Sequence, residues 1–270
     1  MSSNPFVSIV IVTWNSEKDI QDCLKSLKDQ SYKNFNIIIV DNASTDNTIQ
    51  VAKKTFPEAE ILTQSENLFL TGANNLGITH AVTKYNSEYV MVLNPDTYTH
   101  PDLISELLKP FESNGKIGAT GPKVMFWKNE NEGLINSAGL TYDGFMQAYD
   151  IGFKEEDKGQ YDQQKEVFGV TGACIMYKVA MLEEVGLYDN NIKMYLDEVE
   201  LFIRAHKKDW KVVYIPTAVI GHNYMQSTNK NKQFNRQKQM AKAWLIIALK
   251  HYPIKSKLAM VKNYIKFLIS

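Results

Sequence analysis

The sequence has only two cysteines in 270 residues, Cys23 and Cys174, and each lies within an apolar pattern. We therefore expect two buried thiols rather than a disulfide, which agrees with a reducing compartment. No stretch approaches the ~18 apolar residues that a membrane-spanning helix needs. The N-terminus has no basic segment before its first apolar run, so no signal peptide is expected. These absences argue against a disulfide-rich secreted domain and against an integral membrane protein.

Two further absences are local. There is no glycine between Phe6 and Gln30, where a sugar-1-phosphate nucleotidyltransferase needs a glycine-rich triphosphate loop. There is also no acidic residue after Asp209, although residues 210–270 contain eleven lysines and arginines. The whole chain carries 30 basic and 30 acidic residues, so residues 1–209 have a matching acidic excess. This asymmetry favours a polyanionic partner, but no recognition motif supports nucleic acid.

The first half of the chain alternates strand and helix patterns, which predicts an α/β protein with a mostly parallel sheet and helices on both faces. Strands are expected over 7–13, 36–41, 61–63, 88–93 and 117–120, with helices over 17–30, 45–55, 72–85 and 102–112. Residues 122–166 lose this pattern and predict irregular loops with at most a hairpin.

The second half becomes regular again after this region. The pattern predicts strands over 167–177 and 211–215 and helices over 179–185 and 198–208. Two basic helices, 234–250 and 256–269, are expected on either side of Pro253.

The apolar run Ile37–Val40 ends on a carboxylate, Asp41. An unbroken Ile/Val run is typical of a strand that is buried on both faces. Asn42, Ser44 and Thr45 then favour a turn and a helix start. Asp41 is therefore expected at the carboxyl end of a central strand, where open α/β sheets bind ligands, and there it would accept a hydrogen bond.

A second carboxylate follows the predicted strand 88–93, in Asn94-Pro95-Asp96. Asp96 at this edge suits a hard divalent cation, which takes oxygen ligands from carboxylates and from substrate phosphates. The alternative is that Asp96 is a turn residue and the N-cap of a following helix.

Acidic residues also cluster in Tyr195–Arg204, where Asp197, Glu198 and Glu200 open a predicted helix. The helix dipole favours acids in a first turn, and Glu200–Arg204 is an i,i+4 pair of structural type. Crowding beside apolar neighbours would raise the pKa of a carboxylate and make it a proton acceptor. His222 is either a structural histidine or a metal ligand.

In order along the chain, these segments resemble a family 2 glycosyltransferase of the rhamnosyltransferase-like kind. The resemblance runs through Val7–Asn15, Ile39–Asp46, Asn67–Gly77, Leu93–Thr97, Thr171–Cys174, Tyr195–Arg204 and His222. It implies a GT-A fold, a Rossmann-like α/β architecture with a mixed, mostly parallel sheet and C-terminal basic helices. Residues 1–225 would form the catalytic domain, with a nucleotide-binding half (1–121) and an acceptor-binding half (122–225). Residues 226–270 would form a basic amphipathic tail.

The resemblance also implies roles on the donor side. Thr13, Asn15 and Asp41 would hold the base and ribose of a nucleotide sugar, with Asp41 suited to the N3–H of uracil or thymine. Asn74 and Asn75 would line the donor pocket.

Roles in metal binding follow from the same resemblance. Asp96 would be the metal-binding residue of a DxD-type motif, for Mn²⁺ or Mg²⁺. Asn94 takes the first position of this motif without a charge. His222 matches a position that ligands the metal in some relatives.

The reacting groups are implied in the same way. Gly172 and Ala173 would lie near the acceptor and the sugar. Glu198 matches the usual general base, with Asp197 as its rival.

One departure from the family pattern is the segment Asn67–Asn74, where Phe69 and Leu70 stand in place of Gly and Phe. We expect Phe69 not to adopt the φ > 0 conformations that are open to glycine, so this loop would differ in shape.

The implied function is inverting transfer of a hexose, rhamnose-like or other, from a UDP- or dTDP-sugar to a hydroxyl of a glycan or lipid-linked glycan in cell-surface polysaccharide synthesis. The protein would be cytoplasmic. Its basic tail would bind the anionic inner face of the cell membrane, pack in a homodimer, or form a solvated helical face that balances the acidic body. A catalytically silent nucleotide-sugar-binding module is the alternative. A processive synthase is disfavoured, because Gln233-Phe-Asn-Arg236 lacks the Trp of its Gln-x-x-Arg-Trp motif.

Overall fold

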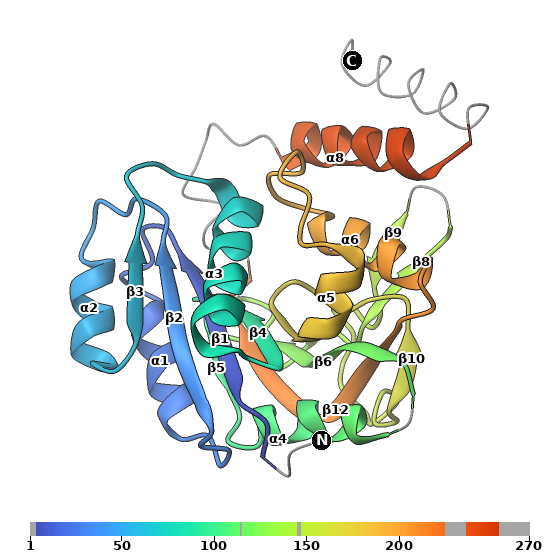
Figure 1. Cartoon of the computed structure of the whole chain (residues 1–270). Helices are drawn as coiled ribbons and strands as arrows, with labels where there is room; N and C mark the ends of the chain where they lie inside the picture. Colours follow the sequence, from blue (N-terminus) through green and yellow to red (C-terminus); the bar gives the residue numbers. More distant parts are fainter. Residues whose placement is uncertain (1–3, 114, 145–146, 225–235, 254–270) are drawn as a thin grey trace.

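The computed structural model describes residues 4–113, 115–144, 147–224 and 236–253. Its centre is a ten-stranded mixed sheet (Figure 1). Four strands at one end are parallel, in the order β4 (Tyr89–Leu93), β1 (Val7–Thr13), β2 (Phe35–Asp41) and β3 (Glu60–Thr63).

The other end of the sheet contains its antiparallel members. β11 (Cys174–Lys178) lies antiparallel between β4 and β6 (Ile117–Phe126), and β12 (Lys211–His222) runs parallel to β6. Three short strands complete the sheet: β5 (Thr97–Thr99) and β10 (Lys165–Val167) on β12, and β7 (Ile135–Ser137) on β6.

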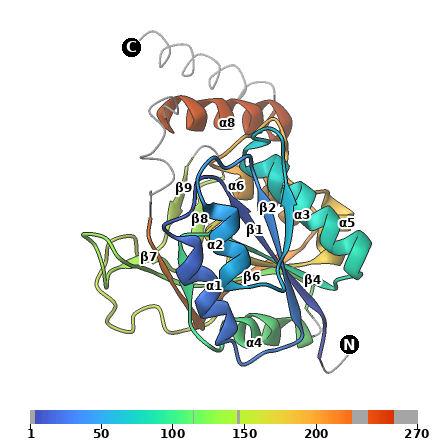
Figure 2. The same ribbon diagram turned by 90° about the vertical axis from the view of Figure 1, so that its left-hand side faces the viewer.

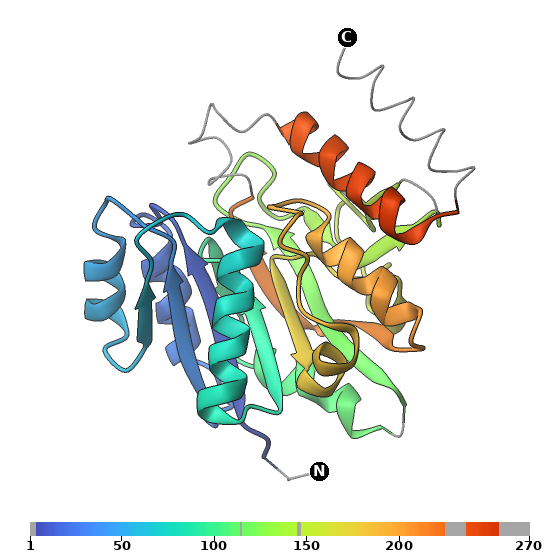
Figure 3. The ribbon, with the colours of Figure 1, turned by 45° about the horizontal axis from the view of Figure 1, so that its top comes forward.

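Helices cover both faces of the sheet because alternate residues of the buried strands point to opposite sides. Ile9 and Ile11 of β1 belong to a core with α1 (Ile20–Lys28), α2 (Thr48–Thr55) and α4 (Leu103–Leu108), which a 3-10 turn, Lys109–Glu112, continues. Val10 belongs to the opposite core, which includes α3 (Phe69–Tyr85), α5 (Val179–Val185) and α6 (Asp197–His206). Figure 3 shows α3 and α5 in front of the sheet.

One edge of the sheet collects the functional segments. β1, β2, β4, β6 and β12 all end there, since β11 is antiparallel to both β4 and β6. The pairing places Thr13 opposite Asp41, and His222 opposite Phe126. β11 begins at this edge, which brings residues 171–173 to the same place.

Helix α8 (Arg236–His251) lies across this edge, away from the N-terminus (Figures 1 and 2). Its Ala243 and Ile247 belong to a small core with Val199 and Ile203 of α6. A separate hairpin of β8 (Leu140–Tyr142) and β9 (Ala148–Asp150) contributes Leu140 to the same core. α8 therefore joins the body of the protein through α6.

The alternating elements of the first half and the hairpin in 122–166 are confirmed, as are the two buried free cysteines. Three predictions were wrong. The strand expected over 167–177 is two strands, because residues 168–173 form a loop between β10 and β11. The expectation of irregular structure after residue 122 missed the continuation of β6 to Phe126, with β7 paired to it. The strand expected to end at Ile215 continues to His222, because a register shift between Ile215 and Val219 accommodates Pro216, which has no N–H.

The alternative that Asp96 caps a helix is also wrong, since strand β5 follows it directly. The helix expected over 256–269 lies outside the described residues. Within the described ranges, no helix combines the length and apolar character that crossing a bilayer requires.

Candidate active site

A cleft of about 350 Å³ opens at the edge where the strands end. Its walls come from every part of the fold: Trp14 after β1, Asp96 after β4, Gly172 before β11, Glu198 on α6 and Arg236 on α8. Asn74, Asn94, Ala173, Asp197 and His222 also line it. The predicted acidic residues after β4 and on α6 therefore share one cavity.

Asp96 and His222 form a pair at the base of this cleft, and both side chains are buried. Nδ1 of His222 lies 3.1 Å from Oδ1 of Asn136, an oxygen that only accepts, so the ring donates from Nδ1. In a neutral ring Nε2 then carries a lone pair, and it faces Oδ1 of Asp96 at 3.3 Å. Two acceptors at this distance attract a cation between them.

This pair fits a divalent cation. Neighbouring ligands of one Mg²⁺ ion, each at about 2.1 Å, are roughly 3 Å apart, close to the Asp96–His222 distance. Asn136 holds the histidine ring in the way that metal-bound histidines are usually held. In the described part of the chain, no third His, Cys, Asp or Glu joins the pair to complete a metal-binding group. Further ligands would therefore come from substrate phosphates and water.

Asp197 and Glu198 lie at the start of α6, directly after a turn in which Tyr195 has φ 63° and Leu196 has φ 60°. Left-handed conformations are unfavourable for such residues, and they cluster at functional sites. The turn directs the acidic pair into the cleft. Asp197 is buried, and Glu198 is partly exposed.

Burial controls the protonation of this acidic pair. It raises the pKa of Asp197 from 3.8 to about 6, against hydrogen bonds from its own N–H and from Glu198. Burial also raises the pKa of Glu198 well above its ordinary value, and the neighbouring charge of Asp197 adds to the effect. The two groups share protons as a unit, so at least one is protonated in mildly acidic solution. Such a pair suits proton transfer.

The loop before β11 borders the acidic pair. The N–H of Gly172 stabilises the carboxylate of Glu198, and a Cβ added at Gly172 would lie 3.9 Å from its Cδ. The carbonyl of Ala173 accepts a hydrogen bond from the N–H of Asn94 at 2.9 Å, which joins this loop to the end of β4. Gly172, Ala173 and Asn94 therefore lie between the acidic pair and the Asp96–His222 pair.

Thr13, Asn15 and Asp41 lie next to the cleft rather than on its surface. Asp41 accepts hydrogen bonds from Oγ1 of Thr13 at 2.9 Å and from the N–H of Ser44 at 3.0 Å. Asn15 accepts from the N–H of Thr45 at 2.8 Å. These bonds shape the loops after β1 and β2, and each carboxylate oxygen of Asp41 keeps a further lone pair.

The two asparagines of α3 have different surroundings. Asn74 lines the cleft, and its buried Oδ1 has no hydrogen-bond partner in the described part of the chain. Asn75 bonds instead to the backbone of Tyr188, donating to its carbonyl at 2.8 Å and accepting from its N–H at 3.0 Å. Asn75 is outside the cleft lining and connects α3 to the segment before α6.

Phe69 contradicts our expectation, since its φ is 59°. The side chain of Asn67 accepts its N–H at 2.8 Å, and that of Asn42 donates to its carbonyl at 3.1 Å. Lys193 also lies over the ring, 3.8 Å from its centroid. These contacts offset the cost of a left-handed phenylalanine, so the loop has the glycine-like backbone without glycine.

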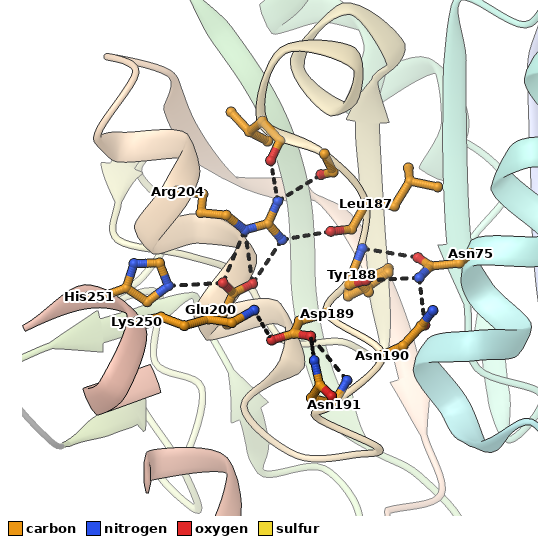
Figure 4. Close-up of polar contacts among 12 residues, drawn as sticks. Asn75, Leu187, Tyr188, Asp189, Asn190, Asn191, Glu200, Arg204, Lys250 and His251 are labelled. Carbon is orange, nitrogen blue, oxygen red and sulfur yellow. Dashed lines mark hydrogen bonds and ion pairs between the residues drawn. The ribbon is translucent and has the colours of Figure 1, made fainter. Parts of the chain in front are cut away.

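A polar network fixes the helix that carries the acidic pair (Figure 4). The buried carboxylate of Glu200 accepts from Nε of Arg204 at 2.9 Å and from Nε2 of His251 at 2.9 Å. Arg204 also donates to the carbonyls of Val185, Gly186 and Leu187. Burial alone would raise the pKa of Glu200, but the bonds from His251 and Arg204 hold it below its ordinary value. The i,i+4 pair predicted as structural is therefore the centre of a larger network.

The sequence patterns missed several residues that line the cleft. Asp150 lies at the end of β9, within residues 122–166, for which the sequence predicted mainly irregular loops. Arg236 lies at the start of α8. Tyr188 and Tyr195 flank α6 from a segment without regular structure. Asn42 follows Asp41 directly, so its position after a buried strand was the available signal.

The fold and this site together define a GT-A type glycosyltransferase: a nucleotide-binding α/β sheet whose edge presents a candidate cation pair opposite an acidic pair. The chain belongs to glycosyl transferase family 2, whose family model matches residues 8–186.

Relatives support this membership. The chain is 22% identical over 264 residues to N-acetylglucosaminyl-diphospho-decaprenol L-rhamnosyltransferase of Mycobacterium tuberculosis, covering 90% of this chain and 84% of the relative. It is 26% identical over 203 residues to the low-salt glycan biosynthesis hexosyltransferase Agl10 of Haloferax volcanii, covering 75% of this chain and 62% of the relative.

Solved structures share the fold at low identity. GalNAc-T7 with UDP, GalNAc and Mn²⁺ matches with a TM-score of 0.66 and 14% identity, over 81% of this chain and 43% of that chain. S. aureus TarS 1–349 with UDP-GlcNAc matches with a TM-score of 0.62 and 14% identity, over 96% of this chain and 71% of that chain. This chain thus spans less than half of the longer structure.

Proposed function

We propose that this protein is a metal-dependent, inverting glycosyltransferase. It would transfer a hexose from a UDP- or dTDP-sugar to a hydroxyl of a glycan or lipid-linked glycan in cell-surface polysaccharide synthesis. The observation that carries this proposal is the single cleft that holds both the Asp96–His222 pair and the Asp197–Glu198 pair. The names of the relatives support the acceptor class, and a UDP-GlcNAc complex among the neighbours supports the donor class.

The donor's base and ribose would lie over Thr13, Asn15 and Asp41. One Asp41 oxygen accepts from Thr13 and the other from Ser44, and the lone pairs left over can accept the N3–H of uracil or thymine. Asn74 would take a hydroxyl of the donor sugar. Asn75 would support this wall through its bonds to Tyr188 rather than touch the donor.

Asp96 and His222 would hold Mn²⁺ or Mg²⁺ with the diphosphate, and Asn94 would supply an amide oxygen. The ion, when bound, stabilises the negative charge that develops on the leaving nucleotide. Two solved neighbours contain Mn²⁺ with a nucleotide or nucleotide sugar, which supports a divalent ion.

Glu198 would accept the proton from the acceptor hydroxyl, with Asp197 sharing its charge. Because Gly172 has no side chain, an acceptor hydroxyl could approach the carboxylate of Glu198 past this residue. One base and one displacement at the anomeric carbon invert its configuration. The second carboxylate that a retaining mechanism needs as a nucleophile is not required.

For the organisation of the chain, we propose residues 1–121 as the nucleotide-binding half, 122–225 as the acceptor-binding half and 226–270 as the basic tail. The tail would place the enzyme on the cytoplasmic face of an anionic membrane. A homodimer interface through the same tail is the other outcome that must be tested.

The test combines binding and turnover. UDP, dTDP and their hexose conjugates should raise the melting temperature more with Mn²⁺ than without it, because a ligand of the folded state stabilises it. Asp96→Asn should abolish the Mn²⁺-dependent part of this shift. Glu198→Gln should keep the shift and lose donor turnover by 10²–10⁴-fold.

Two results would contradict the proposal. Binding of nucleotide sugars without any turnover by the wild-type protein would support a silent binding module. The absence of any nucleotide-dependent shift in melting temperature would exclude both the glycosyltransferase and the binding module.

A further inference from the structure

The cleft contains two buried hydrogen-bond acceptors without donors. In the described part of the chain, Oδ1 of Asn74 and Oδ1 of Asp150 have no hydrogen-bond partner, and both residues line the cleft. Asn74 lies on α3, in the nucleotide half, and Asp150 lies at the end of β9, in the other half. A buried acceptor without a partner is costly, so both atoms point to a ligand that brings O–H or N–H donors.

Asp150 lies among the groups of the active site. Burial raises the pKa of Asp150 above its ordinary value, against a hydrogen bond from the side chain of Ser137 to the carboxylate and the charges of His222 and Arg236. The charge of Asp150 in turn raises the pKa of Glu198. Asp150 therefore lies within electrostatic range of both the Asp96–His222 pair and the base.

Asp150 is not needed for the other roles of the cleft. It does not complete a metal-binding group with Asp96 and His222, since no three such residues in the described ranges do so. In the proposed function, the donor would lie on the wall that carries Asn74. The chemistry left for this carboxylate is recognition of a neutral, hydroxyl-rich ligand beside the base.

An aromatic rim extends outward on this side of the cleft. Tyr224 lines the cleft, and its ring centroid lies 6.0 Å from that of Phe153, which is 41% exposed. Phe126 packs against both rings. Flat aromatic faces suit the C–H faces of pyranose rings, and pockets commonly combine such surfaces with a few placed polar groups.

We infer that Asp150 is the carboxylate that binds a hydroxyl of the acceptor sugar, and that Tyr224 and Phe153 support the sugar ring as it enters. This inference rests on the proposed function, because it assigns the acceptor side of the same cleft. Asp150 would fix the orientation of the acceptor so that a second hydroxyl faces Glu198.

The test uses the full chain and a panel of methyl glycosides of glucose, galactose, mannose, rhamnose and N-acetylglucosamine. Saturation-transfer NMR would measure their binding with UDP and Mg²⁺ and again without nucleotide. We expect the wild-type protein to bind at least one glycoside, and Asp150→Ala to weaken that binding at least tenfold while the affinity for UDP stays within twofold. Asp150→Asn, which preserves shape, should weaken it less.

Asp143→Asn is the matched control, because it removes a charge from the same hairpin while an amide oxygen can still accept the N–H of Gln147. It should bind glycosides as the wild type does. Glycoside binding that survives in Asp150→Ala would overturn the inference, and so would a wild-type protein that binds UDP but none of the glycosides. A wild-type protein that binds neither UDP nor dTDP would contradict the proposed function instead.

Discussion

Several residues of this cleft have backbone conformations or surroundings that lower the stability of the fold. Tyr195 and Leu196 are both left-handed, and each such residue costs on the order of 1 kcal/mol or more. Directly after them, a buried carboxylate, Asp197, and a partly exposed one, Glu198, lie side by side. Sites of this kind commonly reduce stability in exchange for activity, so substitutions at the acidic pair should affect stability and turnover in opposite directions.

Glu198→Gln should stabilise the protein at pH 7.5 by about 1–2 kcal/mol while it abolishes turnover. The folded-state pKa of Asp197 is raised from 3.8 to about 6, so the folded protein binds more protons than the unfolded chain in this range. Wild-type stability therefore falls as the pH rises from about 4 through 6, and the gain of the variant should vanish near pH 4. Urea unfolding at both pH values would measure this. A variant less stable than the wild type at pH 7.5 would show that the pair supports the fold.

Turnover should have the opposite pH dependence. The base works only when it is deprotonated, so kcat/KM of the wild type should rise with pH through the pKa of Glu198, which burial and the charge of Asp197 raise well above its ordinary value.

Asn136 should matter for metal binding although it cannot reach the ion. Its Oδ1 accepts Nδ1–H of His222, which leaves Nε2 free to face Asp96. Asn136→Ala should weaken Mn²⁺ binding in the presence of UDP by 10–100-fold, measured by calorimetry. Asn131→Ala, on the preceding loop, is the control. Equal Mn²⁺ affinity in the two variants would argue that His222 is not a ligand of the metal.

At the scale of elements, the loop between β10 and β11 contains two glycines with different roles. Gly169 is required for packing, and Gly172 borders the base. A Cβ at Gly169 would come within 2.5 Å of the buried ring of Phe202, whereas a Cβ at Gly172 would meet only Glu198, at ordinary contact distance. Gly169→Ala should therefore destabilise the protein by about 1–3 kcal/mol. Gly172→Ala should melt like the wild type but transfer sugar at least tenfold more slowly, since its methyl group occupies the approach to the base. Normal transfer by a stable Gly172→Ala variant would place the acceptor elsewhere.

Helix α6 depends on the network around Glu200. Arg204 satisfies a carboxylate that is 1% exposed and three backbone carbonyls, which one lysine nitrogen cannot do. Arg204→Lys should cost about 2–4 kcal/mol of unfolding free energy. Lys250→Ala removes an ion pair from Asp189, whose side chain is 8% exposed but still accepts hydrogen bonds from Asn191, so it should cost less, about 1 kcal/mol. Equal costs would mean that Glu200 does not depend on the guanidinium.

The elements that the sequence predicted well are those with one clear hydrophobic pattern. The apolar runs of β1, β2 and β4 and the amphipathic α1 follow directly from burial. The patterns failed where the backbone departs from a regular ladder. Pro216 suggested the end of a strand, but the register shift in β12 absorbs it and carries the strand on to His222. Phe69 was expected to avoid φ > 0, but two hydrogen bonds and one cation–π contact hold it in that conformation.

At the scale of the whole molecule, topology explains why much of the cleft was predictable. Carboxyl ends of parallel strands meet at one edge, so Asp96 could be expected there. His222 meets it because β5, which directly follows Asp96, pairs with the end of β12 beyond the expected strand. Asp150 and Arg236 could not be found in this way, because they come from a small hairpin and from a helix that packs on α6. Their positions depend on tertiary contacts such as Ala243 and Ile247 against Val199 and Ile203, which have no local sequence signal.

The charge asymmetry of the whole chain gives the last prediction. Eleven basic residues and no acidic ones follow position 209. Helix α8, whose Arg236 and Met240 line the cleft, carries some of them, including exposed Lys238 and Lys242. If this end faces a membrane, binding to vesicles with 30% anionic lipid should be strong at 50 mM salt and lost near 300 mM, with no binding to neutral vesicles. Lys238→Glu with Lys242→Glu should weaken binding more than tenfold, because each charge near an anionic surface contributes about 1 kcal/mol. Lys18→Glu with Lys53→Glu, two exposed lysines far from α8 in the sequence, is the control of equal charge change. If the full chain does not bind anionic vesicles and sediments as a stable dimer, the basic tail would instead form an interface between two copies.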